Sequence, residues 1–276
     1  MGREFGWHLP GLLALALPVL AGLAYLYAAG APQHYLLVNA GALIAAAALA
    51  VTVRAPSSRR MRQLLIAAMV AALFVPLVTG PYLNGVARWI PLGPVQLQSG
   101  SLLLPAIIIL AARHRNAAAP VLLACVLAGL LQPDAALGFA LVFALLGLHD
   151  VTRDWRVGLA CILAFFASLA MAYRGTPPPQ DFVERVLVDA AQLSIFASIG
   201  LFAALLASFL LILFALPASK AQRYSLAGCL FGFTILSLMA NYPSVLIGYG
   251  AAPILGFGLA LGLSQPSKHE VSPEEK

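Results

Sequence analysis

Charged side chains are scarce in this sequence. Only 9% of the 276 residues are charged and 62% are hydrophobic, and the mean hydropathy is +0.93. Soluble domains usually carry about 25% charged residues, so this chain has too few polar side chains to cover a surface in water. Lipid must be its main solvent, and backbone groups in lipid have to bond within helices or a closed barrel. Because the apolar runs lack the alternation of barrel strands, the sequence predicts an all-α, polytopic integral membrane protein.

Several kinds of site are also missing. The three cysteines, Cys125, Cys161 and Cys229, lie in apolar runs without CxxC spacing, which excludes a disulfide framework and a cysteine zinc site. The histidines are isolated, so we expect no metal site, and there is no Walker loop, HExxH or GxSxG motif. The net charge of +6 comes from small basic clusters between apolar runs. Such clusters indicate anchored cytoplasmic loops and not binding of nucleic acid.

The apolar runs are long enough for about ten membrane-crossing helices, given that about 20 residues cross a bilayer core. Pro18, Pro76 and Pro105 fall inside spans and should kink them. The predicted spans are 9–29, 35–53, 63–80, 94–112, 117–131, 135–149, 157–173, 190–216, 224–241 and 246–263.

The distribution of basic residues places a helix break at Gln132-Pro133-Asp134. With this break, the sixteen Lys and Arg residues divide 13 to 3 between the cytoplasmic and outer sides. If 117–149 were one helix, every later loop would change sides and the split would be 9 to 7. The positive-inside rule favours the first layout, with both termini in the cytoplasm.

The two ends of the chain add little beyond this membrane unit. The basic start and apolar run of residues 9–29 imitate a signal peptide, but the run is longer than a usual signal core and favours a first membrane helix. We expect one transmembrane domain over residues 1–263 and a disordered cytoplasmic tail over 264–276, rich in Ser, Lys and Glu. The expected location is a bacterial cytoplasmic membrane, which the chain crosses many times.

Ionisable side chains gather on the side predicted to face outward. Asp134 and Asp189 abut apolar helices, where a carboxylate usually faces a cavity or a partner. Asp181 and Glu184 follow Pro177-Pro178-Pro179, a neighbourhood that favours ordinary solvated loop positions. The outer cations are Arg88, Arg174 and Arg185.

Three segments, in order, resemble motifs of the SEDS (shape, elongation, division and sporulation) family, typified by FtsW, RodA and SpoVE. Residues 84–93, Asn-Gly-Val-Ala-Arg-Trp-Ile-Pro-Leu-Gly, resemble its outer-loop NGxRRWxxLG, and Leu97-Gln98 follows where the family reads FQPSE. Residues 131–134, Leu-Gln-Pro-Asp, are similar to QPDLGTA at the same outward turn. Residues 243–250, Pro-Ser-Val-Leu-Ile-Gly-Tyr-Gly, look like PLPFISYGG before the last helix.

This resemblance implies a glycosyltransferase that polymerises lipid II into peptidoglycan strands on the outer face of the membrane, for cell division or cell shape. The implied partners are the lipid-linked glycan precursor, a class B penicillin-binding protein and membrane lipids. The residues expected to bind substrate come from the motifs and the outer arginines. They are Arg88, Trp89, Gln132, Asp134, Arg174, Arg185 and Tyr249.

The resemblance also implies an essential aspartate before the eighth helix, in a TDFIFAVIGEELG context. Counting back eleven residues from Gly200 reaches Asp189, whereas Asp181-Phe182-Val183 matches the letters better but needs an eight-residue insertion. We favour Asp189, with Asp181 as the alternative. Its role would be general base toward the acceptor hydroxyl. The outer arginines, or a divalent cation as cofactor, would offset the charge of the pyrophosphate leaving group.

Several positions depart from the family pattern, and they keep other functions open. Ser99-Gly100-Ser101 replaces Pro-Ser-Glu, Leu104 replaces a lysine, and Ala197 and Ser198 replace a Glu-Glu pair. Such losses favour a catalytically inactive scaffold that binds a lipid-linked precursor or a penicillin-binding protein. A flippase or transporter for a lipid-linked substrate is the third hypothesis, but the polar residues cluster at one face and form no path through both leaflets.

Overall fold

The computed structural model describes residues 2–82, 86–92, 95–174 and 180–265, and this part of the chain is almost entirely helical. The all-α prediction is confirmed, with ten helices of 13 residues or more among the described residues. These helices are α1 (Gly2–Ala28), α2 (Gln33–Thr52), α3 (Arg59–Leu73), α5 (Ser99–Ala111), α6 (Arg115–Leu131), α7 (Ala135–Thr152), α8 (Trp155–Arg174), α10 (Ile195–Leu210), α11 (Lys220–Met239) and α12 (Ala251–Ser264). The short elements are α4 (Pro76–Thr79), β1 (Trp89–Leu92), β2 (Val95–Gln98), α9 (Val186–Leu193) and the π-helical turn Leu211–Ala215.

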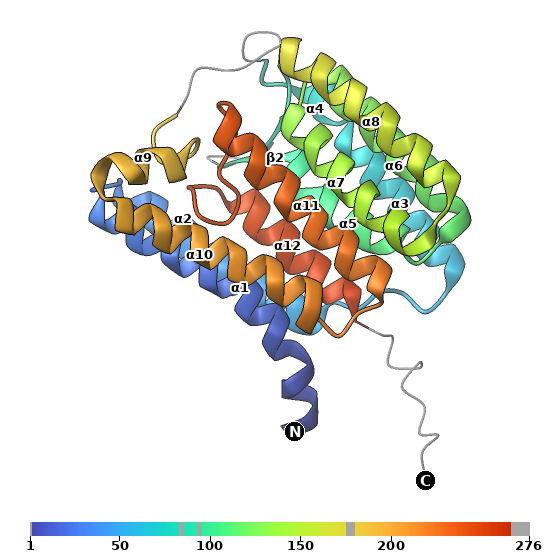
Figure 1. Cartoon of the computed structure of the whole chain (residues 1–276), viewed down its shortest axis with the longest axis horizontal. Coiled ribbons are helices and arrows are strands. Elements are labelled where there is room, and N and C mark those ends of the chain that lie inside the picture. The colour runs from blue at the N-terminus through green and yellow to red at the C-terminus, as the bar shows by residue number, and fades with distance from the viewer. Residues whose placement is uncertain (1, 83–85, 93–94, 175–179, 266–276) are drawn as a thin grey trace.

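The helices run side by side as a bundle (Figure 1). In its middle, α11 packs along α7, and α12 packs between α2 and α5. One flank is formed by α1, α2 and α10, and the other by α3, α6 and α8. Within the described part of the chain, six helical stretches are long and apolar enough to cross a membrane, and α5, α6 and α12 are shorter apolar helices. The architecture is therefore that of a polytopic membrane protein.

Two expected interruptions are confirmed. Helix α6 ends at Leu131 and α7 begins at Ala135, so the chain turns at the predicted break. Helix α3 ends at Leu73 and α4 starts at Pro76, because proline lacks the N–H that would continue the helix.

Three predicted spans have different bounds in the structure. The start of 94–112 is strand β2, which pairs antiparallel with β1, so Trp89 lies opposite Gln98 and helix α5 begins only at Ser99. The span 190–216 is broken at Ser194, which has extended backbone (φ −161°) and separates α9 from α10. The start of 246–263 is irregular, and α12 begins at Ala251.

Glycines allow the central helices to approach closely. A Cβ on Gly228 or Gly232 of α11 would overlap the carbonyl oxygens of Phe143 and Phe139 on α7, and one on Gly147 of α7 would overlap that of Tyr224. In lipid, where water does not drive helices together, such small residues let backbones pack by van der Waals contact. This seam holds the two halves of the bundle together.

The two ends of the bundle differ in charge. At one end, named here the Arg113 end, Arg113 donates to the carbonyls of Leu263, Ser264 and Gln265, and Arg62 donates to His114. The start of α1 and the end of α12 lie toward this end (Figure 1). The other end, the Arg88 end, carries the hairpin β1–β2, the α6–α7 turn and α9. Most of the predicted tail, residues 266–276, lies outside the described residues.

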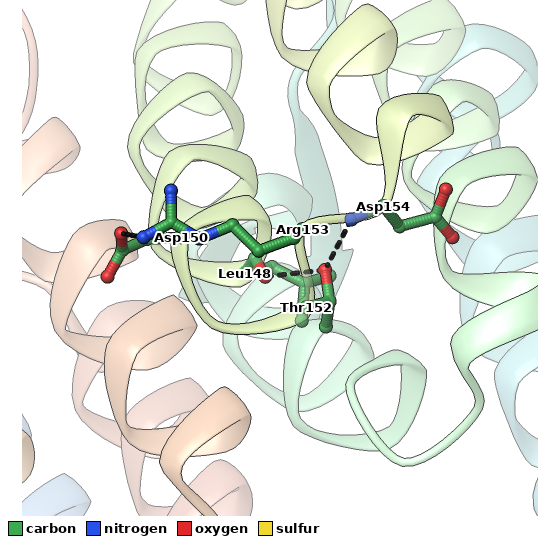
Figure 2. A network of polar contacts seen from close by, with 5 residues as sticks. All are labelled: Leu148, Asp150, Thr152, Arg153 and Asp154. Carbon is green, nitrogen blue, oxygen red and sulfur yellow. Dashed lines mark hydrogen bonds and ion pairs between the residues drawn. The ribbon is translucent and has the colours of Figure 1, made fainter.

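The α7–α8 turn closes the Arg113 end (Figure 2). The Thr152 hydroxyl donates to the Leu148 carbonyl (2.8 Å) and accepts from the Asp154 amide (3.4 Å). Arg153 has a left-handed backbone (φ 54°), and its guanidinium pairs with Asp150 at 2.9 Å. Because this pair is exposed to solvent, it contributes at most about 1 kcal/mol.

The α7–α11 seam predicts the effect of single methyl groups. Gly228→Ala should destabilise the protein by about 1–3 kcal/mol, because the methyl group has no space. Gly41→Ala is the matched control, since a Cβ there meets nothing within 4 Å, and alanine should stabilise the helix by about 0.5–1 kcal/mol. Thermal unfolding in detergent should therefore show a lower midpoint for the first variant only.

Candidate functional site

Arg88 lies at the centre of the polar cluster at the Arg88 end. Its side chain is only 2% exposed. One terminal nitrogen donates to the Pro133 carbonyl and to the Tyr242 hydroxyl (3.3 Å), and the guanidinium carbon lies 4.8 Å from the centre of the Tyr242 ring. A buried cation has to be compensated by acceptors, so Arg88 joins the chain before β1 to the α6–α7 turn and to the segment after α11.

Asp134 caps helix α7. Its side chain is fully buried, and Oδ1 accepts from the amides of Ala136 (3.1 Å) and Leu137 (3.2 Å). Oδ2 accepts from the side-chain amide of Gln98 (3.1 Å), at the end of β2. The neighbouring amide of Ala135 donates to the Tyr242 hydroxyl (3.2 Å). This carboxylate therefore satisfies the start of a helix and fixes the hairpin to it.

Gln132 is also fully buried and bonded within the protein. Its amide nitrogen donates to the Leu73 carbonyl at the end of α3, and its oxygen accepts from the Ser99 hydroxyl (3.4 Å). The structure thus gives both Gln132 and Asp134 a role in joining helix ends. Their predicted contacts with a substrate stay predictions.

The chain after the proline-rich loop docks on the segment that follows α11. We name residues 180–193 the acidic segment and residues 241–250 the docking segment. The Ser244 amide donates to the Val183 carbonyl (2.8 Å) and the Tyr249 amide to that of Phe182 (2.7 Å). In return, the Val186 amide donates to the Ser244 hydroxyl (3.0 Å). These bonds hold the acidic segment against the bundle.

Asn39 and two tyrosines hold the docking segment from the other side. The buried Asn39 amide group of α2 donates to the Gly248 carbonyl (2.9 Å) and accepts from the Gly250 amide (3.0 Å). The ring of Tyr35 stacks on Tyr249 with centroids 3.6 Å apart and meets Phe182 edge-on at 6.3 Å. Tyr249, predicted to bind substrate, is therefore half-buried in an aromatic cluster.

The two candidate catalytic aspartates lie near each other. Asp181 is exposed at the start of the acidic segment, and Asp189 is half-buried in the first turn of α9. Burial raises the pKa of Asp189, the Arg185 charge opposes this rise, and the Asp181 charge adds to it. The structure thus places Asp181, Arg185 and Asp189 within electrostatic range of one another. Which aspartate is the base stays a prediction.

Glu184 corrects an expectation drawn from its sequence neighbours. The expected solvated position is wrong, because Glu184 is only 7% exposed and its backbone bridges to Pro243. Burial raises its pKa to about 7, while the Gln180 amide and the Arg88 charge act in the opposite direction. The signal that sequence reasoning missed is pairing with the docking segment, which lies 59 residues further along the chain.

Not every predicted binding residue belongs to this cluster. Trp89 is half-buried on β1, next to Arg88. Arg174 is exposed at the end of α8, and none of its described contacts joins it to the acidic segment. Asn84, Gly85 and Gly93 of the first motif lie outside the described residues.

Of the positions that depart from the family pattern, residues 99–101 and 104 are closely packed, whereas Ala197 and Ser198 on α10 are partly exposed. Ser99, Ser101 and Leu104 are at most 1% exposed, and a Cβ on Gly100 would lie 3.0–3.2 Å from side-chain atoms of Leu137 and Asp134. These positions therefore offer no room for a larger charged side chain without rearrangement of the helices. Among the described residues there is also no cluster of three His, Cys, Asp or Glu side chains suited to a metal ion.

No protein-family model matches this chain, and no curated protein matches it significantly. Solved structures do. The rod shape determining protein RodA of Thermus thermophilus matches with a TM-score of 0.66, 21% identity and coverage of 91% of this chain and 93% of RodA. Its aspartate-to-alanine mutant matches with a TM-score of 0.69 and 20% identity, and the match covers 91% of this chain and 94% of the mutant. A third match is a chain from a peptidoglycan synthase complex, described as coordinating polymerization and crosslinking. Its TM-score is 0.60 and its identity 25%, and the match covers 91% of this chain and 96% of that chain.

These matches show that the chain has the fold of RodA along nearly its whole length. The predicted multi-pass membrane architecture is confirmed, and the resemblance to the SEDS family is confirmed at the level of the fold. The direction in which each end faces is a separate question, and the cytoplasmic location of both termini stays a prediction.

Two substitutions of Asp134 test its structural role as the cap of helix α7. Asp134→Ala should cost about 0.5–2 kcal/mol of stability, because α7 loses its cap and Gln98 loses its acceptor. Asp134→Asn keeps an accepting oxygen and should keep most of that stability. The measurement is the thermal midpoint in detergent. Equal losses for both variants would show that capping is not what Asp134 contributes.

Proposed function

We propose that this chain is a divergent SEDS-type glycosyltransferase that polymerises lipid II on the outer face of the bacterial cytoplasmic membrane. The observation that carries the proposal is a RodA-like fold over 91% of the chain, together with acidic residues gathered at the end predicted to face outward. This is the side on which lipid II and the growing glycan strand would meet. The role would belong to cell division or to maintenance of cell shape.

Asp189 is the proposed general base, with Asp181 as the alternative. The base would take the proton from the acceptor hydroxyl as its oxygen attacks the anomeric carbon of the donor, and the donor would release its lipid pyrophosphate. The raised pKa of Asp189 supports this role, because a stronger base accepts the proton more readily. Its half-buried position on a short helix outside the long spans supports access from the membrane surface.

The leaving pyrophosphate needs positive charge, and the described arginines differ in how well they fit. Arg185 is exposed and acts electrostatically on Asp189, so it can reach an anion beside the base. Arg88 is buried and Arg174 is exposed at the end of another helix. We therefore assign Arg185 the direct role, with Arg88 organising the site. A divalent cation could add Lewis-acid charge if the pyrophosphate and one carboxylate held it together.

A class B penicillin-binding protein is the proposed partner. The similarity to a chain of a complex that coordinates polymerization and crosslinking supports this assignment. Membrane lipids cover the remaining apolar surface, on which Phe196 and Ile199 of α10 and Leu163 and Phe166 of α8 are largely exposed.

A scaffold without catalytic activity is the second candidate, and the buried departures favour it. Ser101 and Leu104 occupy positions where the family resemblance implies a glutamate and a lysine, and both are buried inside the bundle. A chain that kept the fold and lost those groups could still bind a lipid-linked precursor or a penicillin-binding protein. Only an activity measurement separates the two.

The test is lipid II polymerisation by the purified protein with its cognate penicillin-binding protein. Wild type should form glycan strands, and Asp189→Ala should lower the rate by about 10²–10⁴, the usual contribution of a general base. Asp150→Ala is the control, because Asp150 is exposed at the opposite end. Loss of activity only in Asp181→Ala would move the base to Asp181. Folded wild type that forms no glycan product under any pairing would favour the scaffold instead.

A further inference from the structure

Glu184 has no part in the mechanism above, yet it is the most deeply buried carboxylate of the acidic segment. We propose that Glu184 is a positioning residue, which closes the Gln180–Glu184 turn against the Arg88 cluster and so holds Asp181 and Asp189 in place. This inference rests on the proposed function for its catalytic consequence. Its structural part concerns only how the acidic segment is held.

The turn is closed by both backbone and side chain. The amides of Val183 and Glu184 donate to the Gln180 carbonyl at 3.2 Å each. The Glu184 carboxylate in turn accepts from the Gln180 amide at 3.3 Å. Asp181 lies inside this turn, so the Glu184 side chain restrains the backbone that carries Asp181.

The same residue connects the turn to α9. Arg185 follows Glu184 with a left-handed backbone (φ 55°) and forms the N-cap of α9, whose first turn holds Asp189. The amides of Val188 and Asp189 donate to the Arg185 carbonyl at 2.8 and 3.0 Å. Displacement of Glu184 would therefore move Arg185, and with it the start of the helix that carries Asp189.

Neighbouring charges make this position sensitive to protonation. Arg88 acts on Glu184 from the chain before β1 and favours its ionised form, whereas burial favours the neutral form. The other ionisable groups on the surrounding elements are Asp181, Arg185 and Asp189 on the acidic segment, Tyr242 and Tyr249 on the docking segment, His34 and Tyr35 on α2, and Tyr25 on α1. Because burial prevails, the docked turn holds neutral Glu184 more readily than ionised Glu184.

The direction of the pH effect follows from linkage. Glu184 ionises near pH 4.5 when the segment is undocked and near pH 7 when it is docked. The docked state is therefore favoured fully below about pH 4.5 and loses this advantage progressively as the pH rises to about 7. A glutamine at position 184 keeps the acceptor for Gln180 and removes the titration.

Hydrogen exchange of the full-length protein in lipid nanodiscs tests the proposal directly. After correction for intrinsic exchange rates, the protection of amides in residues 180–193 should fall about tenfold or more between pH 5.5 and pH 8 in wild type. Glu184→Gln should abolish this fall. Asp181→Asn, which removes an exposed carboxylate from the same turn, should keep it. A flat wild-type profile, or an unchanged fall in Glu184→Gln, would overturn the proposal.

Activity gives the second readout. Glycan synthesis by wild type should decline relative to Glu184→Gln as the pH rises from about 4.5 to about 7 and then level off, whereas a purely structural loss would lower the rate equally at every pH. Exchange that follows the prediction without glycan product from any variant would support the positioning role and refute the proposed function. Exchange that is flat while Asp189→Ala abolishes synthesis would do the reverse.

Discussion

The burial of one guanidinium group constrains the whole Arg88 end of the molecule. Arg88 is 2% exposed in a chain whose surroundings are mostly lipid, so its charge must be met by groups of the protein itself. The Pro133 carbonyl and the Tyr242 hydroxyl meet it, and they belong to the α6–α7 turn and to the segment after α11. Asp134 then fixes the hairpin through Gln98. These contacts bring segments that are far apart in the sequence to one place without a bound substrate.

This arrangement separates residues that build the site from residues free to act in it. Gln132 and Asp134 form their hydrogen bonds with helix ends, and Tyr249 is stacked against Tyr35. Asp181 and Arg185 are exposed on the acidic segment and Asp189 is half-buried there, and their charges influence one another. A bound sugar or pyrophosphate can therefore interact with the residues of the acidic segment at a much lower cost in lost protein contacts than with Gln132, Asp134 or Tyr249. The chemistry is accordingly expected on the acidic segment.

Much of the fold could be predicted because lipid imposes simple rules on composition and charge. Apolar runs located the long helices, and the basic residues located the turn at Asp134. The burial of Glu184 could not be predicted, since it depends on pairing with Pro243 in the docking segment. The hairpin before α5 and the break at Ser194 were missed because both lie within runs that are apolar enough to predict one continuous helix. Asn39 could have been noticed, because an amide inside an apolar span usually has a partner. That its partner is the docking segment follows only from the tertiary structure.

The proposed function requires that the Arg88 end, with its acidic segment, faces the outside of the cell. Single-cysteine labelling of intact cells with a membrane-impermeant maleimide tests it most directly, in a background with Cys125, Cys161 and Cys229 replaced by alanine. Asp181 and Arg60 are both exposed and lie at opposite ends. We expect Asp181→Cys to be labelled in intact cells and Arg60→Cys only after permeabilisation. Labelling of Arg60→Cys alone in intact cells would contradict it.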